Sequence, residues 1–433
     1  MNDVASGKSI GYLSAVSIGI GGMVGEGIFA VLGLAVELGQ GGTPIAFGLA
    51  GIVALITSYS YAKLSVRFPS EGGTVEFLNQ AFGSGLVTGG LNILLWLSYV
   101  VMLSLYAYAF GSYGSTFFPD SMQSFLKHVL TSIIIVSLTV VNIAGAKVVG
   151  KWEEWIVGFK VAILLIFISV GIWSSKSHQL QPTIGSNPLQ LVAGGMIIFL
   201  AYEGFELIAN TAKDIKNPEK TLPCAYYSSV VIVILLYVLI AFVTVRNVSV
   251  DNIIQAKDYA LAVAAKPFLG NFGFNLIAVA ALLSTASAIN ATLYGASRVS
   301  FIIAKDGELP EILEEKIWNR PIEGLLITSA LTLIVANTFN LNSISIMGSA
   351  GFLLIFGAVN ASNACLYQKT ASYRWISIAG VIVCSIALFT LIWYTLNNSP
   401  KDILILAFMI CSAFAIEVIY RRCTGRCIKK IHE

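Results

Sequence analysis

One lysine lies within a long apolar stretch, where its charge is costly. Lys160 is the only charged residue between Trp152 and Trp173 after Glu153 and Glu154 at the start of that stretch. A lysine at the centre of a membrane helix costs roughly 2.5–3.5 kcal/mol on insertion scales. Because burial disfavours the charged amine, we expect Lys160 to gain and lose a proton as part of its role. The alternative is a side chain that extends to the membrane interface.

Glycines cluster in the first apolar segment, in the run IGIGGMVGEGIF. Each glycine inside a helix costs about 1 kcal/mol relative to alanine, so the run predicts an interrupted helix with freed amides around Gly25, Glu26 and Gly27. That electropositive helix end suits a carboxylate, while a carbonyl near Met23 suits an ammonium group. Close packing against another helix is the alternative, because Gly21 and Gly25 have a spacing common at membrane helix contacts.

A second polar, glycine-centred interruption lies in the middle of another apolar segment. It consists of Tyr202, Glu203, Gly204, Phe205 and Glu206. In a bilayer, a helix that breaks at membrane depth is tolerated only where it lines a cavity or is buried in protein. Two such breaks at matching places are typical of secondary transporters, whose discontinuous helices bind a small solute near the membrane midplane.

Glu26 complicates the recognition of a carboxylate. An ionised Glu26 would repel a substrate carboxylate through a low-dielectric medium. Three arrangements avoid that repulsion: Glu26 is protonated through burial, it pairs with Lys160 or another cation, or the substrate is a cationic amino acid or a polyamine. A further alternative is that Glu26 points away and caps a half-helix.

The elements that position these residues are membrane helices. The chain has 433 residues, of which 56% are hydrophobic and 11% charged, with a mean hydropathy of +0.81; soluble domains have about 25% charged residues. Windows of roughly 20 residues predict twelve apolar spans, and the shortest of them is 323–338. The spans are 10–36, 43–66, 84–112, 124–146, 152–174, 188–212, 224–245, 272–302, 323–338, 342–366, 374–396 and 401–420.

The distribution of charge predicts the orientation of these spans. Most of the 26 lysines and arginines fall in loops on one side if the N-terminus is cytoplasmic, so both termini are expected in the cytoplasm of a plasma-membrane protein. The net charge of +3 then reflects topology, with a basic tail near lipid headgroups, and no nucleic-acid partner is expected. No cofactor or metal motif is present, and the absence of paired catalytic motifs indicates that the protein is not an enzyme.

The two breaks divide the chain into two units of five spans with opposite orientations. We expect inverted repeats at 1–175 and 176–368, followed by two peripheral helices and the tail at 369–433. In each unit, a long amphipathic connection follows the second helix, at 69–83 and 251–270. The prediction is an all-α polytopic membrane protein of twelve transmembrane helices, with helices 1 and 6 broken.

Four segments, in order along the chain, resemble the signature regions of a known family. They are Ile20–Phe29, Pro69–Gly83 (PSEGGTVEFLNQAFG), Phe199–Pro223 (FLAYEGFELIANTAKDIKNPEKTLP) and Tyr294–Pro310 (YGASRVSFIIAKDGELP). Together they resemble the amino acid-polyamine-organocation superfamily of transporters, and most closely its ApcT-type, proton-coupled members of broad amino-acid specificity. The resemblance covers most of the first ten spans.

The resemblance implies roles around the second break. Leu200 and Glu203 would present carbonyls to the substrate amine, with Tyr202 and Phe205 alongside. Leu200 corresponds to a gating residue that is aromatic in many relatives, and Glu203 stands where many relatives have an apolar side chain. Glu206 matches an acidic residue common after the break, and its alternative role is a structural one, accepting hydrogen bonds from helix ends.

The resemblance also implies how Lys160 acts. A lysine at its place in span five of ApcT-type members occupies the position where sodium-coupled relatives bind an ion. We expect protonated Lys160 to donate hydrogen bonds to a carbonyl near Gly21 and to a hydroxyl of span eight, among Ser284, Thr285 and Ser287. Loss of the proton would release the inner half of helix 1. Each hydroxyl has the alternative of bonding to its own helix.

The prediction is therefore a secondary active transporter of amino acids, coupled to protons and working by alternating access. Two alternatives stay open: an exchanger or a carrier of cationic amino acids and polyamines, and a non-transporting solute sensor with the same fold. A channel is disfavoured because no selectivity loop stands out. The identity of the substrate and the oligomeric state are left open.

Overall fold

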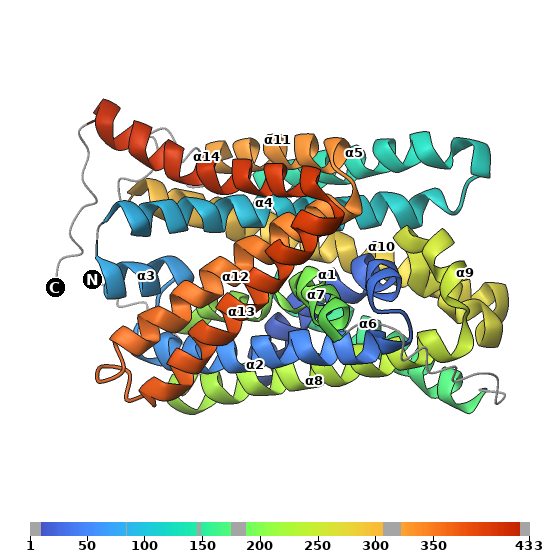
Figure 1. Ribbon diagram of the computed structural model, residues 1–433, viewed down its shortest axis with the longest axis horizontal. Helices are drawn as coiled ribbons and strands as arrows, with labels where there is room; N and C mark the ends of the chain where they lie inside the picture. Colours follow the sequence, from blue (N-terminus) through green and yellow to red (C-terminus); the bar gives the residue numbers. More distant parts are fainter. Residues whose placement is uncertain (1–9, 84, 145–148, 175–187, 306–321, 425–433) are drawn as a thin grey trace.

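The computed structural model describes residues 10–83, 85–144, 149–174, 188–305 and 322–424. These parts of the chain are built from helices, joined by short turns (Figure 1). In order they are α1 (Tyr12–Gly39), η1 (Gln40–Gly42), α2 (Thr43–Arg67), α3 (Thr74–Phe82), α4 (Leu86–Ser115), α5 (Asp120–Ala144), α6 (Val149–Trp173), α7 (Pro188–Ile197), η2 (Phe199–Tyr202), η3 (Phe205–Asp214), α8 (Pro218–Asn247), α9 (Val250–Gln255), η4 (Lys257–Tyr259), α10 (Ala260–Lys305), α11 (Ile322–Thr338), α12 (Leu341–Cys365), α13 (Arg374–Asn398) and α14 (Pro400–Thr424).

The predicted polytopic, all-helical membrane class is confirmed. Each of the twelve predicted apolar segments coincides with a helix or with the bent run α7–η2–η3. Within the described residues, nine helical stretches are long and apolar enough to cross a membrane, and the bent run makes a tenth. The stretch that contains α11 is among the shorter apolar helices, so the count of twelve crossings stays a prediction.

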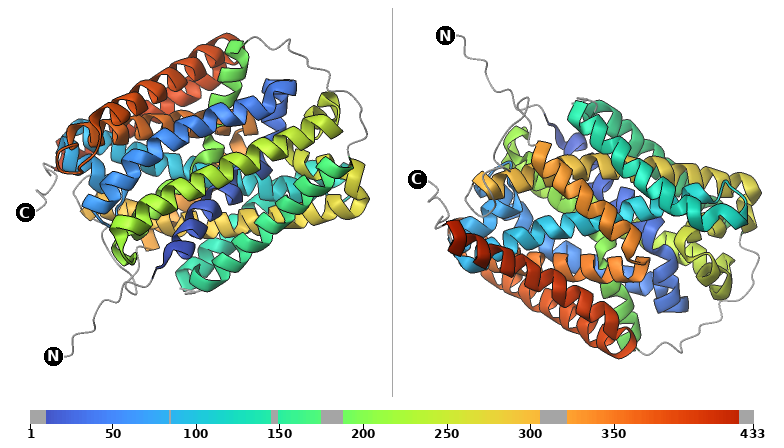
Figure 2. Two further views of the ribbon diagram at one scale, coloured as in Figure 1. Left: turned by 90° about the horizontal axis from the view of Figure 1, so that it is seen from below. Right: turned by 90° about the horizontal axis from the view of Figure 1, so that it is seen from above.

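Helices that the predicted repeats would make equivalent pack against each other. The second span packs on the seventh (α2 with α8), the third on the eighth (α4 with α10), and the fourth on the ninth (α5 with α11). The central helix, α1, contacts most of these elements. By contrast, α13 and α14 lie at the edge of the bundle, as both views of Figure 2 show.

The two predicted amphipathic connections lie at opposite ends of the bundle (Figure 1). The first contains α3, which buries one face with Val75, Phe77 and Leu78. The second is built from α9, η4 and the first turns of α10, and it ends at Gly270, whose φ of 61° bends that helix. We call these two ends of the bundle the α3 end and the α9 end.

Candidate functional site

The interruption predicted at Gly204 is confirmed. α7 ends at Ile197, two short 3-10 helices follow, and the two parts of the run are bent by 52°. At the bend, Glu203 is extended (φ −65°, ψ 154°) and Gly204 has a φ of 115°. That value lies in the region that favours glycine, since other residues meet a steric clash there. The sequence forms the break because Gly204 tolerates this conformation between two buried polar residues.

The interruption predicted in the first span is wrong. α1 runs as a single α-helix from Tyr12 to Gly39, so its backbone amides around Gly25 and Gly27 stay within the helix. The glycines instead admit close neighbours: a Cβ on Gly22 would lie 2.8 Å from the carbonyl oxygen of Gly204, and one on Gly27 would lie 2.6 Å from the Cβ of Ala201. The packing alternative therefore prevails, because close contact with a neighbouring backbone offsets the low helix propensity of glycine.

A tyrosine that the sequence analysis missed joins the two spans. The hydroxyl of Tyr237, on α8, lies within hydrogen-bonding distance of the carbonyl oxygens of Met23 (2.5 Å) and Ala201 (3.1 Å). The carbonyl of Met23, which was expected to accept from a substrate amine, thus has a protein donor in this structure. A hydroxyl in the apolar run VILLYVLIAF was the available signal, but its partners lie on other helices.

The short helix η2 is held by α12. The backbone amide of Leu200 donates to Ser349 Oγ (3.0 Å), and that hydroxyl donates to the carbonyl of Ile197 (2.7 Å). The Leu200 side chain is buried against Gly348, where a Cβ would lie 2.5 Å from a Leu200 methyl group. Ser349 was not predicted, because its pairing depends on the placement of a helix about 150 residues later in the chain.

Tyr202 and Phe205 are buried among other side chains. The hydroxyl of Tyr202 donates to the carbonyl of Phe47 on α2 (2.9 Å). The ring of Phe205 packs on Tyr61 and Phe356, with ring centroids 5.4 and 5.2 Å apart. Both side chains therefore brace the bent run against its neighbours.

Two buried carboxyl groups flank the bend. Glu206 accepts a hydrogen bond from the backbone amide of Gly204 (2.7 Å) and one from the hydroxyl of Tyr99 (3.4 Å). Glu203 accepts a hydrogen bond from the hydroxyl of Tyr106 (3.3 Å). The bond to Gly204 matches the structural role that was the alternative for Glu206.

Lys160 contacts the first span where it was expected to. Its side chain is buried, and Nζ donates to the carbonyl oxygen of Gly21 (2.8 Å). A Cβ on Gly25 would lie 2.9 Å from the same Nζ, so glycine at that place makes room for the amine. The side chain of Glu26, also predicted to bind substrate, lies outside what the structure describes.

Within the part of the chain that the structure describes, the hydroxyls of span eight do not make the hydrogen bonds that were predicted for them. Ser284 is buried beside Gly25, but its hydroxyl makes no hydrogen bond with the described residues, so the predicted bond between Lys160 and Ser284 is wrong for this structure. Thr285 donates to the carbonyl of Ala281 in its own helix (2.7 Å), which was the alternative role. Ser287 is half-buried on the same helix.

Taken together, the fold and these contacts define a polytopic membrane protein in which a glycine-rich span contacts both a bent span and a buried lysine. The chain matches the amino acid permease family over residues 14–417. It is 37% identical over 421 residues to an uncharacterized protein of Methanocaldococcus jannaschii, covering 97% of each chain. The inner membrane transport protein YbaT of Escherichia coli is 35% identical over 353 residues, which is 81% of this chain and 82% of that protein. The serine/threonine exchanger SteT of Bacillus subtilis is 28% identical over 309 residues, or 70% and 69% of the two chains.

The chain therefore belongs to the amino acid permease family. The predicted membership of the amino acid-polyamine-organocation superfamily is confirmed, and the protein is a transporter of amino acids rather than an enzyme.

Proposed function

We propose that this protein is a proton-coupled secondary transporter of amino acids, with Lys160 as the proton carrier. The observation that carries the proposal is the bond from the buried Nζ of Lys160 to the carbonyl oxygen of Gly21 (2.8 Å). A charged donor makes a hydrogen bond about twice as strong as a neutral one. Gain or loss of the proton therefore changes how tightly α6 holds α1.

The proposed architecture has twelve crossings arranged as two inverted repeats of five, at 1–175 and 176–368, and two peripheral helices at 369–433. Three packing pairs support it, since α2 with α8, α4 with α10, and α5 with α11 join equivalent members of the two repeats. The placement of α3 and α9 at opposite ends of the bundle agrees with opposite orientations of the repeats (Figure 1). The proposal also has both termini in the cytoplasm of a plasma-membrane protein, as the distribution of lysine and arginine predicts.

The substrate is proposed to bind where α1 crosses the bent span. In the conformation described, Gly22 and Gly204 are in backbone contact, so the crossing is closed. Substrate enters when α1 and η2 separate, which frees the carbonyls of Met23 and Ala201 from Tyr237. The residues assigned to this site are Met23, Gly25, Glu26, Gly27, Leu200, Tyr202, Glu203 and Phe205; Gly21 and Ser287 are assigned to coupling with Lys160, with Thr285 and Glu206 as further candidates.

Exchange is the second candidate function, because one relative is named a serine/threonine exchanger. Cationic substrates are a variant of the first proposal, favoured by the buried carboxyl group of Glu203 at the bend. Both differ from proton symport of a neutral amino acid in what drives net uptake.

The test is uptake by the purified full chain in proteoliposomes. A panel of neutral and basic amino acids and polyamines is offered with and without an inward proton gradient. The proposal expects saturable amino-acid uptake that the gradient accelerates. Uptake only into vesicles preloaded with unlabelled amino acid would identify an exchanger, and absence of both uptake and counterflow would identify a sensor and overturn the proposal.

A further inference from the structure

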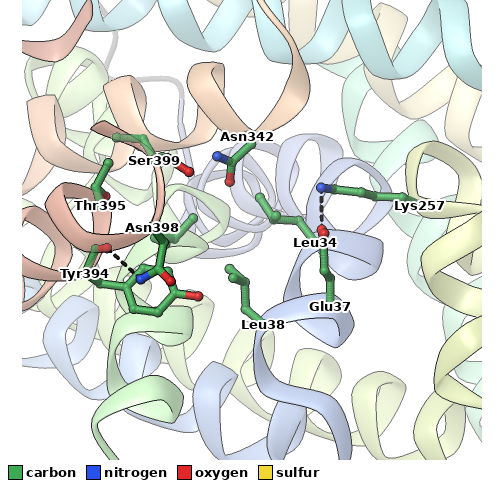
Figure 3. A pocket seen from close by; sticks show the side chains of 11 residues that line it. Leu34, Glu37, Leu38, Lys257, Asn342, Tyr394, Thr395, Asn398 and Ser399 are labelled. Atoms are coloured by element: carbon green, nitrogen blue, oxygen red, sulfur yellow. Dashed lines mark hydrogen bonds and ion pairs between the residues drawn. The ribbon is translucent and has the colours of Figure 1, made fainter. Parts of the chain in front are cut away.

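A cavity of about 230 Å³ opens at the α9 end of the bundle. It lies between the last turns of α1, η4, the start of α12 and the end of α13 (Figure 3). None of the described side chains that were predicted to bind substrate lines it. Ile197, the last residue of α7, does line it, so the cavity reaches the bent run next to its break.

The cavity has charges of both signs on one wall. Glu37 of α1 and Lys257 of η4 form an ion pair there, with side chains that are 38% and 25% exposed (Figure 3). Part-exposed ion pairs of this kind contribute little to stability, so either partner exchanges readily for a charged ligand group. Oε2 of Glu37 is buried and, apart from the ion pair, accepts no hydrogen bond from the described residues.

One wall of the cavity is apolar, and the start of α12 and the end of α13 contribute a polar wall made of Asn342, Tyr394, Thr395, Asn398 and Ser399. Leu34 and Leu38 lie on the same helix as Glu37, and Ile346 lines the cavity from α12. Pockets for drug-sized ligands have volumes of about 300–1,000 Å³, so this smaller cavity admits a single small molecule. An apolar wall beside one cation and one anion suits a zwitterion with an apolar side chain.

We infer that this cavity is a second binding site for a free neutral amino acid, separate from the crossing of α1 with the bent span. Glu37 accepts hydrogen bonds from the ligand's ammonium group, Lys257 donates to its carboxylate, and the apolar side chain lies against Leu34 and Ile346. The inference rests on the proposed function, because the cavity would take the same class of substrate. Substrate would occupy this site before it reaches the bent run.

The number of bound ligands tests the inference. Labelled L-leucine is titrated to saturation onto the detergent-purified full chain. We expect two leucines per unaltered chain, and one per chain in Glu37→Gln and in Lys257→Gln, each of which keeps a polar side chain of similar size but removes one charge. Lys127→Gln is the matched control, because it breaks the Lys127–Asp258 ion pair (2.7 Å) at the same end of the bundle without touching the cavity, and it keeps two.

Leucine analogues that lack one charged group distinguish a ligand site from an ion pair that only joins α1 to η4. Labelled isoamylamine, which lacks the carboxylate, should bind to Lys257→Gln with one more molecule per chain than to Glu37→Gln. Labelled 4-methylpentanoate, which lacks the amine, should show the reverse preference. If the ion pair only joined the two helices, neither analogue would prefer one variant, and that result would overturn the inference.

The leucine count also separates failure of this inference from failure of the proposed function. One or no leucine per unaltered chain, or two in both variants, would overturn the inference. Persistent uptake of the amino-acid panel in that case leaves the proposed function standing. Absence of uptake and counterflow by the unaltered chain overturns the proposed function itself.

Discussion

Gly22 and Gly204 meet backbone to backbone where α1 crosses the bent span. A Cβ on Gly204 would lie 2.6 Å from the amide nitrogen of Met23, and one on Gly22 would lie 2.8 Å from the carbonyl oxygen of Gly204. Both distances are shorter than real Cβ contacts. The two spans are therefore as close as their backbones allow, and closure of the site depends on the absence of side chains at these two positions.

Gly204→Ala should destabilise the protein by about 2–5 kcal/mol. Of this, roughly 1–2 kcal/mol comes from the left-handed backbone conformation and about 1–3 kcal/mol from overpacking against α1. The free energy of unfolding in mixed detergent micelles measures the effect. Gly158→Ala is the matched control, because a Cβ at Gly158 would meet nothing within 4 Å; equal stability of the two variants would contradict the closed crossing.

Replacement of Glu206 should depend on whether an acceptor remains for the amide of Gly204. Glu206→Ala leaves that buried amide without its partner, at a cost of about 1–3 kcal/mol. Glu206→Gln keeps a side-chain oxygen at the same place and should lose less. Thermal denaturation of the purified variants measures the difference, and equal losses would show that the bond to Gly204 does not stabilise the bend.

Tyr237→Phe should loosen the joint between the first span and η2. The change removes the hydroxyl that reaches the carbonyls of Met23 and Ala201, and one such bond contributes about 0.5–1.5 kcal/mol. The free energy of unfolding is again the measurement. Tyr373→Phe serves as the control, since that side chain is 68% exposed and should change stability little; a loss as large as that of Tyr237→Phe would contradict the assignment.

The bend at Gly204 was predictable, and the course of α1 was not. Tyr202, Glu203 and Glu206 surround a single glycine in an apolar run, and this pattern predicted the break. A run of glycines, by contrast, serves equally for a break and for close packing, and the outcome for Gly22 depends on the backbone of Gly204, far along the sequence. That approach is a tertiary contact that local propensity does not encode.

Some contacts of the site could likewise be predicted from the sequence, and others could not. The bond from Lys160 to the first span could be predicted, because a lone buried lysine must find an acceptor and the resemblance indicated where. Tyr237 and Ser349 were missed because a hydroxyl in an apolar helix does not show which neighbouring helix it faces. Ser284 was placed near the right helix, but its rotation relative to Lys160 could not be read from spacing.

The most direct test of the central claim is the proton dependence of uptake by Lys160→Gln in proteoliposomes. The unaltered chain should take up amino acid severalfold faster with an inward proton gradient than without one. The variant should fold and bind substrate but show the same rate in both conditions, while Lys266→Gln, which removes a lysine elsewhere, should respond as the unaltered chain does. A full response to the gradient in Lys160→Gln would contradict the role of Lys160 as the proton carrier.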